Sequence, residues 1–286
     1  MSHTDVLNRY LFDNKHARGE LVQLEQSFQK IIANHTYSDG VKTLLGELLA
    51  ATCLLTATLK FKGEISVQLQ GDGPLAYMVI NGNDQQEMRG IAKLEQETDA
   101  CGLQGLIGKG VMVITIRPDQ GEPYQGVVAL EKPTLAECLA NYFESSDQIP
   151  TTIWLFTDLA QQKVAGSLIQ LLPDGNDKAQ QVADYEHLCQ LTNTIKAEEI
   201  FSLPAQELLY RLYHQEEVRI FEPQAVNYQC TCSEEKCLTA ISQFSVDELK
   251  NILADEGCVS MTCDFCLTTY AFDEQQLAGV LNKTKH

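Results

Sequence analysis

The spacing of hydrophobic residues divides the first part of the chain into two helices followed by a series of strands. Residues 28–34 and 41–60 have helical spacing, and the second segment is apolar on nearly every face, which predicts a buried helix. From residue 64 onward, apolar positions recur at every second residue in short runs separated by turns. The strand-like runs are residues 64–70, 75–80, 111–117, 126–130, 153–156 and 167–172.

The turns in this region are too short to hold a crossover helix. The sequence Gly-Asp-Gly-Pro at residues 71–74 leads directly from one run to the next, and short connections of this kind join antiparallel strands. One helix interrupts the strands, because Thr134 and Glu137 form a capping box at the start of residues 135–143. The sequence therefore predicts an α+β domain built on antiparallel sheet over residues 1–173.

A turn-rich sequence, Pro-Asp-Gly-Asn-Asp at residues 173–177, marks a boundary. Beyond it the pattern becomes helical over residues 183–195 and 204–213, and the second of these segments begins with proline at a favoured first-turn position. Its apolar stripe consists of Leu208, Leu209, Leu212 and Tyr213. A helix this short cannot bury such a stripe alone, so we expect residues 174–229 to form a helical linker that docks on the first domain.

The last module, residues 230–286, is too small to fold on a hydrophobic core alone. Between its two cysteine pairs the sequence has one clear helix at residues 246–254, which begins at a capping box of Ser245 and Glu248 and ends before Gly257. Domains of this size usually need a metal ion or disulfides.

Four cysteines in this module have the spacing of a zinc site. Cys230-Thr-Cys232 and Cys263-Asp-Phe-Cys266 present two close pairs of thiolates, the usual donor set of a closed tetrahedral zinc centre. Four sulfur ligands leave no open position for a substrate, which argues against hydrolytic zinc.

Most zinc sites of this kind are structural, so the spacing alone favours a ribbon that only holds the tail together. The single residue between Cys230 and Cys232 favours a reversible redox switch instead. A disulfide across one residue is strained and easily reduced again, as a reversible switch requires.

Loss of zinc would have a large energetic effect on this module. A structural zinc contributes about 10–16 kcal/mol of folding free energy in small modules. Two disulfides closing short loops return only a few kcal/mol. We therefore expect zinc loss to unfold the module and to loosen the preceding linker, and this makes Leu208, Leu209 and Leu212 a possible binding surface for client proteins.

The remaining cysteines carry no such signal. Cys237 and Cys258 lie near the two pairs and could act as competing ligands or resolving thiols, although a bystander role is the expected one. The other four lie on apolar stretches and are expected to be small core residues. They are Cys53, Cys101, Cys138 and Cys189. None of the six histidines is assigned to the metal.

Charge and composition narrow the class of protein. With 21 basic and 39 acidic residues the chain has a formal charge of −18, which repels phosphate backbones and argues against nucleic-acid binding. Residues 44–59 are the most apolar stretch, but Glu47 and several threonines interrupt it and it is short for a bilayer crossing. The N-terminus has no signal-peptide pattern, so we expect a cytoplasmic protein whose ten cysteines are in a reducing compartment. The sequence shows no nucleophilic triad and no phosphate-binding loop, so an enzyme is not expected.

Several segments together resemble the 33 kDa heat shock protein family. In the last module these are Cys-Thr-Cys-Ser at residues 230–233 with Cys237 after it, and Met-Thr-Cys-Asp-Phe-Cys at residues 261–266. Earlier in the chain they are Gln-Leu-Gln-Gly-Asp-Gly-Pro (68–74), Ile-Asn-Gly-Asn (80–83), Tyr-Gln-Gly-Val (124–127), Ile-Lys-Ala-Glu-Glu (195–199) and Leu-Pro-Ala (203–205). The resemblance extends from about Tyr10 to the C-terminal helix, and the combination of motifs is highly specific.

The resemblance implies a redox-regulated bacterial chaperone that holds unfolding proteins without ATP. The reduced form would bind one zinc through the four cysteines and be inactive. Oxidants acting together with unfolding stress would form Cys230–Cys232 and Cys263–Cys266 disulfides and release the zinc. The linker, residues 174–229, would then loosen, and the protein would dimerise and bind clients.

The chain departs from the family pattern beside the cysteines. A Ser-Glu-Glu-Lys loop at residues 233–236 replaces the Arg-rich loop usual in relatives, Cys258 stands where an acidic residue is common, and Leu267 stands where glycine is common. Negative charge disfavours thiolates and slows attack by anionic oxidants. The hypothesis that follows is that this protein needs more oxidant or more heat to switch.

Two other functions remain as alternatives. Cys263 and Cys266 could serve a thiol-disulfide oxidoreductase, although such motifs usually open a helix in a βαβ setting, whereas here an extended run follows. A zinc-ribbon adaptor for nucleic acid is the other alternative, and the acidic balance of the chain counts against it.

Overall fold

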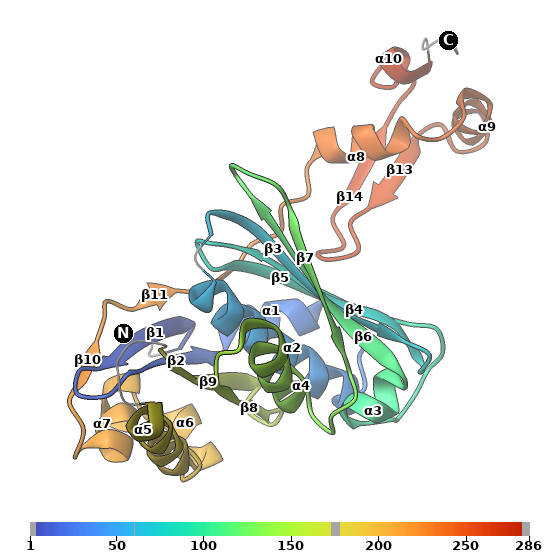
Figure 1. Cartoon of the computed structure of the whole chain (residues 1–286). Coiled ribbons are helices and arrows are strands. Elements are labelled where there is room, and N and C mark those ends of the chain that lie inside the picture. Colours follow the sequence, from blue (N-terminus) through green and yellow to red (C-terminus); the bar gives the residue numbers. More distant parts are fainter. Residues whose placement is uncertain (1–3, 60, 173–177, 282–286) are drawn as a thin grey trace. The chain divides into compact units, whose positions relative to one another are not determined.

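The chain forms two compact units, Met1–Gln229 and Cys230–His286 (Figure 1). This computed structural model describes residues 4–59, 61–172 and 178–281. The turn-rich boundary expected at residues 173–177 lies outside these described residues. Each unit has a hydrophobic core of its own.

Two six-stranded sheets form the framework of the first unit. The first sheet has the order β10-β1-β2-β9-β8, with β11 also pairing with β1. Its strands are β1 (Val6–Phe12), β2 (Ala17–Leu24), β8 (Thr151–Asp158), β9 (Lys163–Leu171), β10 (Val218–Ile220) and β11 (Gln224–Ala225). All of its pairings are antiparallel.

The second sheet has the order β12-β5-β4-β3-β6-β7. Its strands are β3 (Gly63–Gly71), β4 (Leu75–Asn83), β5 (Glu87–Leu94), β6 (Gly110–Pro118), β7 (Tyr124–Ala129) and β12 (Asn227–Tyr228). The pairing of β12 with β5 is parallel, and the others are antiparallel. The predicted α+β class with an antiparallel sheet is confirmed, although β1, β2 and β5 were not foreseen.

The long helix α2 (Asp39–Thr58) contacts strands of both sheets and forms the centre of the core. By length and composition it is the one described helix that could cross a membrane, but 72% of its apolar window is buried inside the protein. Its apolar character is that of a core helix, as its all-round hydrophobic pattern predicted.

Shorter helices complete the first unit around α2. They are α1 (Gln26–Ala33), α3 (Gly102–Ile107) and α4 (Leu135–Tyr142), which continues into the π-helical turn η1 (Phe143–Asp147). The predicted capping box of α4 is present, because Thr134 Oγ1 accepts from Glu137 N at 3.2 Å and Glu137 Oε2 accepts from Thr134 N at 3.1 Å.

The linker helices α5 (Lys178–Thr192), α6 (Ala197–Ser202) and α7 (Ala205–Tyr213) pack on the first sheet. Figure 1 shows them in yellow and orange, grouped together. Leu208, Leu209 and Tyr213 are buried and Leu212 is half-buried, in one cluster with Tyr10 and other side chains of β1, β2 and β9. The predicted docking of the apolar stripe is therefore confirmed. The end of the linker is not helical, because it forms β10, β11 and β12.

Polar contacts add to the docking of the linker. Lys15 Nζ donates to Asp184 Oδ1 at 2.7 Å, and the single tryptophan, Trp154 on β8, donates from Nε1 to Asn193 Oδ1 at 2.7 Å. Gln23 Nε2 donates to the carbonyl oxygen of Ile200 at 2.6 Å. The linker is thus attached to the first sheet by a hydrophobic cluster and a rim of hydrogen bonds.

The second unit contains α8 (Glu234–Ile241), α9 (Val246–Glu256), the hairpin β13 (Val259–Thr262) and β14 (Thr269–Phe272), and α10 (Ala278–Leu281). The capping box of Ser245 and Glu248 and the left-handed Gly257 bound α9 as predicted. The acidic segment expected to be a loop is instead the cap and first turn of α8, since Ser233 Oγ accepts from Lys236 N at 3.2 Å. The cysteine pairs are therefore separated by two helices, where the sequence predicted one.

Candidate metal centre

Two backbone segments of the second unit present the four cysteines. Cys230 and Cys232 lie in the extended segment directly before α8, and Cys263 and Cys266 lie in the turn that joins β13 to β14. This turn is closed by Cys263 N, which donates to the carbonyl oxygen of Thr268 at 2.9 Å, and by Leu267 N, which donates to the carbonyl oxygen of Cys263 at 2.8 Å. A helix start and a hairpin turn thus position all four side chains.

The four Sγ atoms form a compact group in which all lie within 4.8 Å of one another. Cys230 Sγ is 3.7 Å from Cys263 Sγ, and Cys232 Sγ is 3.5 Å from Cys266 Sγ. Zinc–sulfur bonds of about 2.3 Å in a tetrahedron place sulfur atoms about 3.8 Å apart. The spacing therefore fits a four-thiolate zinc, and in the described part of the chain this is the one such group of three or more metal-ligating side chains.

Hydrogen bonds in the hairpin turn distinguish the two thiols that it carries. Burial raises the pKa of Cys263 to about 12, despite hydrogen bonds from the backbone of Cys266 and Phe265 to its sulfur. Burial acts in the same direction on Cys266, but hydrogen bonds from the side chain and backbone of Thr268 outweigh it and lower its pKa to about 6. Cys266 is therefore the more acidic thiol of this turn.

The surroundings of the Cys-x-Cys segment are polar. Burial is the main reason why the pKa of Cys232 is raised, and its Sγ lies 3.3 Å from the Tyr270 hydroxyl. That contact is the first cause of a pKa of about 12 for Tyr270. Lys236 Nζ donates to the carbonyl oxygen of Thr231 at 2.8 Å, which places a positive charge beside the segment. Metal binding must displace the protons of the neutral thiols, so affinity depends on pH.

Leu267, which follows the fourth cysteine, has a left-handed backbone with φ of 57°. A side chain in this region costs about 1–2 kcal/mol, and glycine avoids that cost. The Leu267 side chain is 46% exposed, so packing compensates little of the strain. The sequence showed an unusual residue here, but only the backbone shows the strain.

The other cysteines lie outside this group. Cys237 is buried in the small core of the second unit and Cys258 is half-buried, and neither belongs to the set of four. The core prediction for the remaining cysteines is confirmed for Cys53 and Cys138, while Cys189 is half-buried. It is wrong for Cys101, which is exposed directly before α3 because the extended chain there turns its side chain to solvent.

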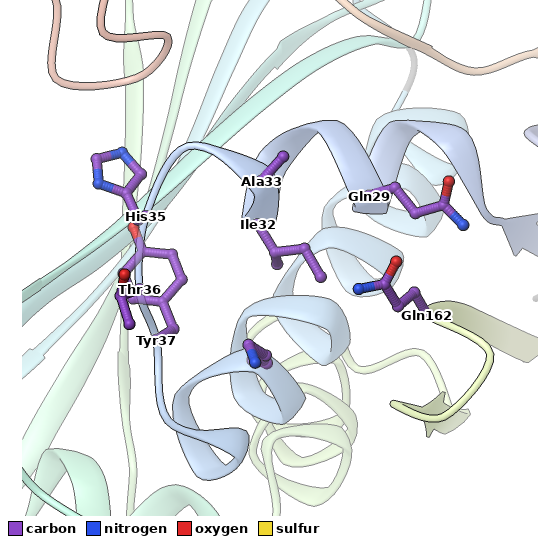
Figure 2. Close-up of a pocket in the computed structure, with 8 residues that line it drawn as sticks. Gln29, Ile32, Ala33, His35, Thr36, Tyr37 and Gln162 are labelled. Atoms are coloured by element: carbon purple, nitrogen blue, oxygen red, sulfur yellow. The ribbon is translucent and has the colours of Figure 1, made fainter.

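The first unit contains a surface hollow of about 380 Å³ between α1, the start of α2 and the β8–β9 turn. Figure 2 shows Gln29 and Gln162 at one end of it and His35, Thr36 and Tyr37 at the other. His35 stacks on Tyr37 with ring centroids 5.3 Å apart. The lining contains no carboxylate, and its titratable side chains are His35, Tyr37 and Lys42.

Comparison with known proteins gives a consistent result. The family model described as Hsp33 protein matches residues 5–273. The chain is 64% identical to a 33 kDa chaperonin of Colwellia psychrerythraea strain 34H, with 100% of both chains covered. It is 56% identical to a 33 kDa chaperonin of Shewanella sp. strain ANA-3, covering 96% of this chain and 95% of the relative. The crystal structure of a 33 kDa chaperonin from Thermotoga maritima has the same fold, with a TM-score of 0.80, 24% identity, and coverage of 97% and 98%.

Proposed function

Because the chain belongs to the Hsp33 protein family, we propose that it is a chaperone that oxidation activates and that holds unfolding proteins without ATP. The group of four thiols within 4.8 Å carries this proposal. Four soft sulfur donors at tetrahedral spacing suit zinc, which would hold the second unit folded and the chaperone inactive in the reduced state.

Oxidation removes the ligands from the metal. Each disulfide forms when two thiolates lose two electrons to one hydrogen peroxide, which takes up two protons and leaves as two waters, while zinc departs as Zn²⁺. Cys230–Cys232 and Cys263–Cys266 are the proposed pairs. The Sγ–Sγ distances also allow cross-pairing, in which Cys230 joins Cys263 and Cys232 joins Cys266. Disulfide mapping of the oxidised protein by mass spectrometry distinguishes the two schemes.

Loss of zinc affects the linker because the linker is directly continuous in sequence with the second unit. The proposed metastable linker, residues 174–229, ends where Cys230 begins. Zinc contributes about 10–16 kcal/mol to modules of this kind, and short-loop disulfides return only a few kcal/mol. The second unit then unfolds, the linker helices detach from the first sheet, and Leu208, Leu209 and Leu212 become available to clients. Two oxidised copies associate in the cytoplasm, with no role for nucleic acid or membrane.

The test is light scattering of heat-unfolding citrate synthase in the presence of this protein. We expect suppression of aggregation by the peroxide-treated protein, with release of one zinc, and none by the reduced, zinc-loaded protein. Equal suppression by both forms would make the zinc purely structural. No suppression by either form would refute the chaperone function.

The hairpin placement of Cys263 and Cys266 does not favour a thiol-disulfide oxidoreductase. In such enzymes the pair opens a helix of a βαβ unit, and here it lies between β13 and β14. Turnover in an insulin-reduction assay would contradict this assignment.

A further inference from the structure

The last twelve residues of the first unit lie along the edges of both of its sheets. β10 and β11 pair with β1, with Tyr10 opposite Ile220 and Leu7 opposite Gln224. One residue after β11, β12 begins and pairs with β5 in parallel, with Met88 opposite Tyr228. Figure 1 shows β10 and β11 in orange beside the blue β1. Residues 218–229 therefore cover one edge of β1 and one edge of β5.

Backbone hydrogen bonds attach this segment to both sheets. Val226 N donates to the carbonyl oxygen of Asp5 at 2.8 Å, Asn227 N to that of Gln86 at 3.0 Å, and Gln229 N to that of Met88 at 2.9 Å. Hydrogen bonds of this kind do not depend on which side chains the paired segment carries. The edges of β1 and β5 can thus pair with extended chains of many sequences.

Val226 is the most deeply buried side chain of the segment. Val226 is 1% exposed and belongs to the main hydrophobic cluster, and its carbonyl oxygen accepts from Ser27 Oγ at 3.3 Å. Its neighbours Ala225 and Asn227 are exposed. The position of Val226 therefore selects a small apolar side chain, while Val218, Ile220 and Tyr228 pack partly buried against the two clusters.

The attachment is short. β11 and β12 have two residues each, and β10 has three. Strands of this length add little stability by themselves. The segment can therefore leave both edges while the remainder of the two sheets stays paired.

We propose that residues 218–229 occupy a client-binding edge, and that an extended apolar segment of an unfolding protein replaces them by adding a strand to β1 and β5 with one small apolar side chain in the site of Val226. This inference rests on the proposed function, because the segment must first detach. In the reduced protein the segment occupies these two edges and competes with the client for them.

Hydrogen exchange on the full chain tests the replacement, with unfolded citrate synthase as the client. Oxidation should increase amide exchange in β1 and β5 about tenfold or more, and added client should restore protection there. Edges that stay protected after oxidation, or that client leaves unprotected, overturn the inference. If the oxidised protein also fails to suppress aggregation, the proposed function fails with it; if it suppresses aggregation, only the strand-addition site is wrong.

A pair of variants tests the competitor role. Val226→Asp should free the segment, so that the reduced, zinc-loaded protein suppresses aggregation, whereas Ala225→Asp at the exposed neighbouring position should leave it inactive. Exchange in β3 and β4 identifies a Val226→Asp protein that has lost its fold. A folded Val226→Asp protein that stays inactive, with β1 and β5 exposed to exchange, contradicts the inference.

Discussion

At the scale of single residues, two positions hold their side chains at an energetic cost. Leu267 has a left-handed backbone beside Cys266, one of the four proposed zinc ligands. Glu20 on β2 is buried, with Thr58 Oγ1 donating to its Oε2 at 3.0 Å. The strain at Leu267 affects the zinc affinity that we propose for the hairpin turn. The burial of Glu20 affects how the stability of the first unit depends on pH.

Replacement of Leu267 by glycine should tighten zinc binding. Glycine relieves the backbone strain, but it also increases the chain entropy of the unfolded state. The net gain in the free energy of zinc binding is about 0.7 kcal/mol, or about threefold in affinity. Competition of the reduced protein with a chromogenic chelator measures this. Leu267→Ala shortens the side chain but keeps Cβ, so it should bring no gain; equal effects of both variants would show that backbone strain is not the cause.

Glu20→Gln should stabilise the first unit in alkaline solution. Burial raises the pKa of Glu20 to about 7 in the folded protein, from an ordinary value of 4.5. The folded state therefore binds the proton of Glu20 more tightly than the unfolded state does. The stability that this proton contributes is fully present below pH 4.5 and is lost as the pH rises through about 7. The loss amounts to about 3 kcal/mol. Denaturant unfolding should show an advantage of Glu20→Gln at pH 8 that disappears near pH 5, while exposed Glu64→Gln shows none.

At the scale of helices and strands, the start of α8 combines a helix cap with the acidic pair beside the thiols. Glu234 and Glu235 lie in its first turn, where negative charge favours a helix N-terminus by about 0.3–1 kcal/mol each. The same charges repel anionic oxidants from the thiolates. We therefore expect the acidic pair to affect both the stability of α8 and the rate at which anionic oxidants reach the thiols.

Replacing Glu234 and Glu235 with arginine should speed zinc release by hypochlorite. Both consequences act in this direction, because α8 loses favourable charge and the anionic oxidant is attracted. Zinc release is followed with a colorimetric chelator, and the double replacement of exposed Asp255 and Glu256 on α9 with arginine is a control of the same charge change. Unchanged release kinetics would refute the hypothesis that this protein needs more oxidant to switch.

Several elements could be predicted because their own sequence determines them. α2 is apolar all round, and α4 and α9 begin at capping boxes that the structure contains. β2 was missed because it is buried on both faces and lacks an alternating pattern. β10, β11 and β12 are too short for a periodic signal, and their partners alone make them strands. The cysteines were identifiable from spacing, whereas the strain at Leu267 needed the backbone.

At the scale of the whole molecule, the two separate cores predict two separate unfolding events. The core of the second unit has six buried residues, too few to be stable without a metal. Chelation of zinc from the reduced protein should abolish the unfolding transition of the second unit and keep that of the first. A single transition that chelator shifts as a whole would show that the units unfold together.

Trp154 should report on the linker in the same experiment. It is the single tryptophan of the chain, and its Nε1 donates to Asn193 just beyond α5. Detachment of the linker exposes the indole, so its emission should shift to longer wavelength on oxidation. If chelation of zinc unfolds the second unit but leaves the emission wavelength of Trp154 unchanged, loss of the second unit does not by itself release the linker.

The pairing of β2 with β9 also has a consequence for synthesis. The first sheet joins residues 17–24 to residues 164–171, while β3 to β7 are contiguous in sequence between them. On the ribosome, β3 to β7 can pair with one another while β2, which pairs with β1, still lacks its other partner β9. Until Leu171 emerges, the nascent polypeptide leaves β2, which is buried in the folded protein, without its partner β9. The newly made chain is then itself an incompletely folded protein, the kind of molecule to which we propose the finished chaperone binds.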